Sequence, residues 1–153
     1  LLASITNANP KIANYQFTTL NPNLGVASYD DKEITIADIP GLIEGAHEGT
    51  GLGVQFLKHI ERCKTLVHLI DITNNDLEKS YHQVKNELKS YSPDLLKKKE
   101  LIVLNKIDLI GEELAKEIAD DFSKKIDKEI LILSTLKKSS VSKIKAKLIS
   151  YVS

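Results

Sequence analysis

The sequence predicts an α/β fold, with an open and mostly parallel sheet that carries helices on both faces. Three short apolar runs, at residues 66–70, 101–104 and 130–133, are typical of buried strands, because each is too short for a helix and is bounded by polar residues. Between them, residues 77–91 and 114–126 carry apolar side chains at helical spacing. Strands that alternate with helices indicate parallel pairing, and folds of this kind bind ligands beyond the carboxyl ends of their strands.

The remaining elements fit the same fold. Residues 24–29 and 33–37 indicate two strands on either side of Asp30-Asp31-Lys32, a hairpin-like turn that predicts one antiparallel edge strand. Further helices are expected at the start of the chain through Ile5, near residues 52–62 and at residues 141–151.

Length and composition limit the class of protein. A chain of 153 residues, 42% of them hydrophobic, can bury the core of one domain, so we treat residues 1–153 as a single domain. The 21 basic and 21 acidic residues balance, so no overall charge attracts nucleic acid or an anionic membrane. The single cysteine, Cys63, and the lack of an apolar run of about 20 residues indicate a cytoplasmic protein without a membrane span. We take it to be a monomer that does not bind DNA.

The motif Asn105-Lys106-Ile107-Asp108 follows the strand predicted at residues 101–104. A carboxylate at Asp108 can accept hydrogen bonds from the N1–H and the exocyclic amine of guanine, a pair of donors that adenine lacks. The methylene stem of Lys106 can cover the flat base, and Asn105 can tie its loop to neighbouring backbone groups. An ordinary polar turn is the alternative, and we favour base recognition because the motif directly follows a strand.

A second motif, Asp38-Ile39-Pro40-Gly41, follows the strand predicted at residues 33–37. This D-x-x-G pattern is common, and Pro-Gly is a frequent turn signal without chemistry. In a nucleotide triphosphatase, an aspartate here holds Mg²⁺, usually through water, and the glycine lets a backbone N–H approach the γ-phosphate. Five of the seven glycines fall between Gly41 and Gly53, which favours a nucleotide-gated switch over a loop that merely turns.

Two pairs of hydroxyl residues leave two interpretations open. Thr18-Thr19 lies upstream of the first predicted strand, where one threonine can bind Mg²⁺ through its hydroxyl and the γ-phosphate through its N–H, or the pair can simply favour β-structure. Ser134-Thr135 follows the strand at residues 130–133, where backbone amides can meet guanine O6 or merely form a turn.

Together these motifs resemble the Obg family of translational GTPases. Residues 13–25 are similar to the first switch of that family, and residues 38–53 to its long, glycine-rich second switch. The resemblance implies the Ras-like G-domain fold of P-loop GTPases and a switch protein that binds GTP or GDP with Mg²⁺, hydrolyses GTP and acts in maturation of the large ribosomal subunit. The motifs and the resemblance assign catalytic roles to Thr19 and Gly41, metal binding to Thr19 and Asp38, and nucleotide binding to Asp38, Gly41, Asn105, Lys106, Asp108, Ser134 and Thr135.

The chain departs from the family pattern in several places. The phosphate-binding G-x-x-x-x-G-K-S/T loop is absent, although residues 1–5 look like the helix that follows it. Since the chain also contains no Met, we interpret Leu1 as a cut point that removes the first strand, this loop and an upstream glycine-rich domain. We therefore expect these residues alone to bind nucleotide weakly and to hydrolyse almost none. Gln16 replaces a usual proline and Thr135 a usual alanine, and neither change removes a reacting group.

The position after D-x-x-G is Leu42, where the small GTPases carry a glutamine that orients the attacking water. Leucine has no polar atom, so slow intrinsic hydrolysis is expected, with the water placed by a backbone group, a cation, Glu44, His47 or a partner. One alternative is a guanine-nucleotide sensor or assembly scaffold that does not hydrolyse GTP. Another is a relative that uses ATP.

Overall fold

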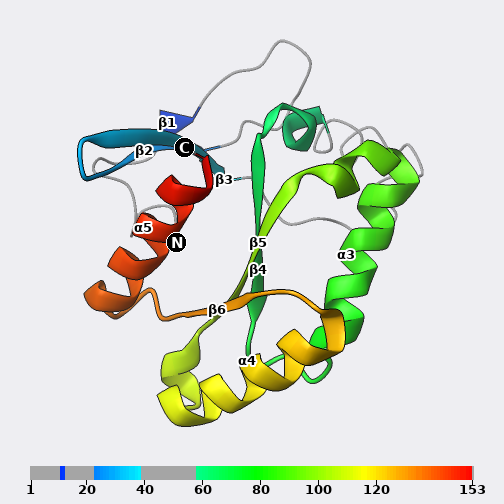
Figure 1. Ribbon diagram of the computed structural model, residues 1–153, viewed down its shortest axis with the longest axis vertical. Helices are drawn as coiled ribbons and strands as arrows, with labels where there is room; N and C mark the ends of the chain where they lie inside the picture. The colour runs from blue at the N-terminus through cyan, green and yellow to red at the C-terminus, as the bar shows by residue number, and fades with distance from the viewer. Residues whose placement is uncertain (1–10, 13–22, 39–57, 153) are drawn as a thin grey trace. The chain divides into compact units, whose positions relative to one another are not determined.

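The computed structural model describes residues 11–12, 23–38 and 58–152 (Figure 1). The chain divides into two compact units, which are described separately. The first unit comprises Leu1–Lys64 and Gln83–Lys98, and the second comprises Thr65–His82 and Lys99–Ser153.

The second unit is built on a parallel sheet of three strands in the order β4 (Thr65–Asp71), β5 (Lys99–Asn105) and β6 (Ile130–Leu133). The apolar run of the central strand, residues 101–104, is fully buried, as predicted. The expectation of a buried strand is wrong for part of β4, where Val67 and Leu69 are 36% and 39% exposed. Among the described strands, β4 is an edge strand of this sheet and pairs only with β5.

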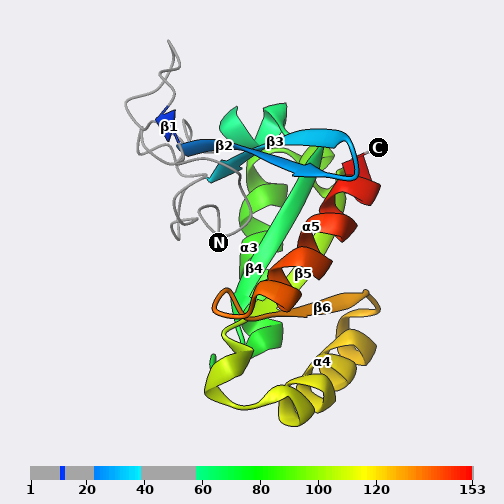
Figure 2. The same ribbon diagram turned by 90° about the vertical axis from the view of Figure 1, so that its left-hand side faces the viewer.

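Three helices accompany the sheet: α3 (Leu77–Tyr91), α4 (Glu112–Ile126) and α5 (Lys138–Val152). Figures 1 and 2 show α4 and α5 on opposite sides of β6. The core on the α4 side joins Ile102 and Leu104 of β5 to Tyr81, Ala115 and Phe122. Because side chains alternate along a strand, the buried Leu101 and Val103 face away from this core. The predicted parallel sheet with helices on both faces is therefore confirmed.

The first unit contains an antiparallel sheet of β1 (Lys11–Ile12), β2 (Asn23–Tyr29) and β3 (Lys32–Asp38). Asp30 and Asp31 join β2 to β3 with φ values of 52° and 59°, so two left-handed residues make the tight turn that a hairpin requires. The predicted hairpin is confirmed. The short β1 was not predicted, and among the described residues the antiparallel strands pair only with one another rather than forming one edge of the parallel sheet.

Residues 58–62 of the first unit are helical, in agreement with the helix predicted near residues 52–62, whose earlier part lies outside the described residues. The ammonium group of Lys98 donates to the backbone carbonyls of Glu61 at 2.8 Å and Cys63 at 2.6 Å. A lysine at this end satisfies carbonyls that have no partner within the helix and opposes their partial negative charge. In the described part of the chain, no helix is long and apolar enough to cross a membrane.

Candidate functional site

Polar side chains collect at the carboxyl edge of the parallel sheet in the second unit. Asp71 ends β4, Asn105 ends β5, and Ser134 directly follows β6. The parallel register sets Asp71 opposite Asn105, and Asn105 opposite Leu133, the residue before Ser134. The sheet therefore brings the ends of three strands to one edge, which is where ligands bind in open α/β sheets.

The carboxylate of Asp108 is held by the loop that follows β6. The hydroxyl of Ser134 donates to Oδ1 of Asp108 at 2.6 Å, and Ser134 itself is completely buried. The same hydroxyl accepts the backbone N–H of Leu136, while the N–H of Ser134 donates to the hydroxyl of Ser140 at 3.0 Å. Ser134 thus acts through its side chain on Asp108, which was not predicted, and Asp108 remains exposed to accept further donors.

Asn105 presents an acceptor with no donor among the described residues. Its backbone carbonyl accepts the N–H of Ile72 at 3.0 Å, which ties the ends of β4 and β5 together. Its side-chain oxygen Oδ1 is buried and accepts no hydrogen bond in the described part of the chain. The side-chain tie expected from the sequence is therefore not formed there. A buried amide oxygen of this kind is costly without a partner, which favours a donor from a ligand or from residues outside those described.

Lys106 is held at both its backbone and its ammonium group. Its backbone is left-handed, with φ 68° and ψ 32°, and its carbonyl accepts the N–H of Leu109 in the short helix η3 (Ile107–Leu109). Its ammonium group donates to Oδ2 of Asp71 at 2.6 Å. Left-handed backbone at a residue other than glycine is uncommon and gathers at functional sites.

Asp71 is a residue of this site that the motifs missed. Its Oδ1 accepts both the hydroxyl of Thr73 at 2.7 Å and the N–H of Thr73 at 2.9 Å. The hydrogen bond from Lys106, followed by the two from Thr73, lowers the pKa of Asp71 to about 2. Because Asp71 follows the strand predicted at residues 66–70, the rule that drew attention to Asn105 could have found it as well.

The other predicted residues are not brought into this cluster. Thr135 is half-buried in the turn after Ser134, and its expected contact with a base remains a prediction. Asp38 is exposed at the end of β3 in the first unit. Thr19 and Gly41 lie outside the described residues, as do Leu42, Glu44 and His47. Within the described part of the chain, no group of three or more His, Cys, Asp or Glu side chains could hold a metal ion.

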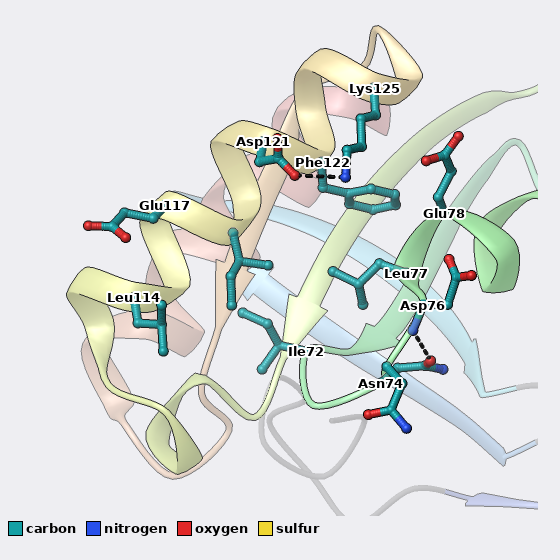
Figure 3. A pocket seen from close by; sticks show the side chains of 12 residues that line it. Ile72, Asn74, Asp76, Leu77, Glu78, Leu114, Glu117, Asp121, Phe122 and Lys125 are labelled. Carbon is teal, nitrogen blue, oxygen red and sulfur yellow. Dashed lines mark hydrogen bonds and ion pairs between the residues drawn. The ribbon is translucent and has the colours of Figure 1, made fainter.

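A groove of about 400 Å³ in the second unit lies between the loop that follows β4 and helix α4 (Figure 3). Ile72, Leu77 and Phe122 give it an apolar floor. Its acidic rim is accounted for locally, because Asp76 accepts the backbone N–H of Lys79 at the start of α3 and Asp121 pairs with Lys125 at 2.9 Å. The groove shares no residue with the cluster at the sheet edge.

A parallel α/β sheet with an N-K-x-D motif at its carboxyl edge defines the G-domain fold of P-loop GTPases. A solved structure supports the fold: a variant of Era from Aquifex aeolicus, bound to GDP·AlF₄⁻, matches with a TM-score of 0.74 over 98% of this chain and 51% of that chain. At 23% sequence identity, this likeness concerns the fold alone.

Sequence comparisons identify the family. Residues 1–106 match the family described as 50S ribosome-binding GTPase. The GTPase Obg of Pelagibacter ubique is 76% identical over 153 residues, which is 100% of this chain and 47% of that protein. The GTPase Obg of Rickettsia felis is 53% identical over 143 residues, 94% of this chain and 43% of that protein. The chain therefore belongs to the 50S ribosome-binding GTPase family, in its Obg branch, and it spans less than half the length of these two curated relatives.

Proposed function

We propose that the protein containing this chain is a switch that binds GTP and GDP, hydrolyses GTP slowly and takes part in assembly of the large ribosomal subunit. The proposal of nucleotide binding is supported mainly by the carboxylate of Asp108. Buried Ser134 donates a hydrogen bond to one of its oxygens, and the side chain remains exposed at the sheet edge. The ribosomal part rests on the family alone.

The chemistry of the edge suits guanine. An anchored carboxylate can accept the N1–H and the exocyclic amine of the base together, and it would repel the ring nitrogen that adenine presents at the same place. Lys106, half-exposed beside it, offers a methylene stem to one face of the ring. The buried Oδ1 of Asn105 adds an acceptor that still needs a donor. The backbone N–H of Thr135 would meet guanine O6, since the N–H groups of Ser134 and Leu136 already donate to serine hydroxyls.

For the phosphate end of the nucleotide, we propose the residues that the motifs and the family resemblance assign. Asp38 is an exposed carboxylate, the kind of oxygen ligand that Mg²⁺ prefers, and we propose that it holds the ion together with the hydroxyl of Thr19. When bound, Mg²⁺ offsets the negative charge of the phosphates. The backbone N–H of Gly41 would contact the γ-phosphate. We further propose that a phosphate-binding loop and a glycine-rich domain are encoded upstream.

A test of base recognition replaces Asp108 by Ala in the intact protein and compares the affinities for GTP and ATP. The preference for GTP should fall by several orders of magnitude, because two hydrogen bonds that distinguish the bases are lost. Asp94→Ala is a matched control, since Asp94 is an exposed carboxylate in the short helix η2 (Pro93–Lys97). An unchanged ratio of the two affinities in Asp108→Ala would refute the assignment.

Hydrolysis needs its own experiment, because Leu42 offers no polar atom to the attacking water. Single-turnover GTP cleavage by the intact protein should be slow alone and faster with large ribosomal subunits. A rate no higher than that of free GTP in both conditions would instead establish a guanine-nucleotide sensor or scaffold. Co-sedimentation of the GTP and GDP forms with large ribosomal subunits tests the proposed partner.

The chain's single cysteine favours a reducing compartment, and we infer a cytoplasmic location.

A further inference from the structure

A lysine and an aspartate 35 residues apart form an ion pair at the sheet edge. The ammonium nitrogen of Lys106 lies 2.6 Å from Oδ2 of Asp71. The two side chains are 54% and 37% exposed, so Coulomb attraction between them is partly screened by water and contributes modestly to the stability of the fold. Because this ion pair adds little to the stability of the fold and Lys106 is two residues from Asp108, we looked to nucleotide binding for its role.

The carboxylate of Asp71 is itself fixed before it meets the lysine. Thr73 occupies Oδ1 through both its hydroxyl and its backbone N–H, which leaves Oδ2 as the oxygen for Lys106. The hydrogen bonds from Lys106 and Thr73 also lower the pKa of Asp71 to about 2, which extends its ionised range to more acidic pH. The carboxylate of Asp71 is therefore charged and held in one orientation.

The backbone brings the partner to this fixed charge. Parallel pairing sets Asp71 opposite Asn105, and Ile72 donates to the carbonyl of Asn105 at 3.0 Å. Lys106 comes next, in a left-handed conformation that turns the chain out of the strand. Its backbone is held by the η3 turn and its ammonium group by Asp71, so both ends of the methylene stem are fixed. A free lysine would sample many rotamers instead.

From this geometry we propose that Asp71 is a positioning residue for guanine nucleotide, which holds the Lys106 stem in place for the face of the base. The inference rests on the proposed function, because it presumes that Lys106 covers the base. Binding then costs less rotamer entropy, since the lysine is ordered before the nucleotide arrives. Thr73 acts one step further away by holding Asp71.

The test is a double-mutant cycle in the intact protein, with the affinity for a fluorescent GDP analogue as the readout. Asp71→Asn should weaken binding by about tenfold, as expected when one flexible side chain must be ordered on binding. Lys106→Met keeps an apolar stem without the charge. In the Lys106→Met background, Asp71→Asn should change the affinity less than about twofold, because the interaction it removes is already absent.

Controls separate this role from structural damage. Asp94→Asn removes a lysine–aspartate pair of similar length, 2.7 Å, and should leave the affinity unchanged. Thermal unfolding of each variant shows whether the fold is intact. Thr73→Val removes the hydroxyl bond to Asp71 and should weaken binding less than Asp71→Asn does, since the backbone N–H of residue 73 still holds Oδ1.

Three results would overturn the proposal: unchanged affinity in Asp71→Asn, tighter binding in Asp71→Asn, or the same loss in the presence and absence of the lysine charge. Tighter binding would mean that the pair competes with the nucleotide. These failures are distinct from failure of the proposed function. If Asp108→Ala loses its guanine preference while Asp71→Asn binds normally, the function stands and the positioning role falls. If the unmodified protein binds no GDP analogue, the function itself falls.

Discussion

The hydroxyl of Ser134 donates to Oδ1 of Asp108 at 2.6 Å and connects two loops that are separated by 26 residues in the sequence. Asp108 lies in the turn after β5, and Ser134 is fully buried after β6. An exposed carboxylate alone would rotate freely, whereas one bonded to a buried hydroxyl presents its remaining lone pairs in a fixed direction. Under the proposed function, the carboxylate that recognises guanine therefore depends on a residue that need not touch the base.

Ser134→Ala tests this dependence. The substitution leaves the Asp108 carboxylate in place but removes the hydrogen bond that fixes it, so the affinity of the intact protein for GDP should fall by about tenfold. Isothermal titration calorimetry measures the change. Ser139→Ala, at an exposed serine in the first turn of α5, should bind like the unmodified protein. Equal affinities for Ser134→Ala and Ser139→Ala would show that Asp108 needs no anchor.

Sequence patterns predicted the parallel strands, the helices and the motif after β5, because each depends on residues close together in the chain. The bounds of α3 and β6 were predicted without error, since apolar spacing and polar flanks define them. The Asp71 and Lys106 pair was not predicted. It depends on the register between β4 and β5 and on a left-handed backbone at a lysine, and neither is encoded in a local pattern.

The same contrast holds for the exposed part of β4 and for Ser140. Val67 and Leu69 belong to the run at residues 66–70 that predicts a buried strand, but burial depends on which elements cover the strand. The hydroxyl of Ser140 accepts the N–H of Ser134 across the turn into α5, a contact that one serine among several near position 140 does not reveal. Residues that act on other residues of a site are therefore the part that sequence patterns miss.

The buried side chain of Tyr81 should make the protein less stable at high pH. Tyr81 is 4% exposed, and its ring stacks on His68 and lies edge-on to Phe122. Burial, reinforced by nearby Glu100, raises the pKa of Tyr81 from 10.0 to about 12. A raised pKa in the folded state gives stability that is fully present below the unfolded pKa and is lost as pH rises through the folded one. Stability should therefore fall between pH 10 and about 12, by on the order of 1 kcal/mol.

Denaturant unfolding of the unmodified protein and of Tyr81→Phe across this range checks the prediction. Phenylalanine cannot ionise, so the difference between the two unfolding free energies should shrink as pH rises from about 9 to about 12. Tyr29→Phe changes a tyrosine that is 46% exposed, and its curve of unfolding free energy against pH should run parallel to that of the unmodified protein. Parallel curves for Tyr81→Phe would refute the role assigned to burial.

Gly111→Ala should destabilise the protein through backbone strain alone. Gly111 precedes α4 with φ 89° and ψ 155°, a region that is nearly restricted to glycine, and an added Cβ would meet no atom within 4 Å. The expected loss is about 2 kcal/mol of unfolding free energy, measured by urea denaturation. Lys124→Ala on the exposed side of the same helix should change it by less than about 0.5 kcal/mol. A loss no larger than that of Lys124→Ala would contradict the assigned strain.

At the opposite end of α4, we expect a substitution of Asp127 to stabilise the protein. Asp127 follows the helix in a left-handed conformation, with φ 52° and ψ 49°, and its negative charge lies beside the carbonyls that end the helix. Asp127→Gly should raise the unfolding free energy by about 0.5 kcal/mol, because glycine adopts this conformation without steric cost and carries no charge.

Asp127→Asn separates the two causes, since asparagine removes the charge and keeps the side chain. A gain in Asp127→Asn equal to that in Asp127→Gly would assign the effect to the charge, and it should then shrink in high salt. A gain in Asp127→Gly alone would assign it to the backbone. Destabilisation by Asp127→Gly would instead mean that the added freedom of the unfolded chain outweighs the relief of strain at this position.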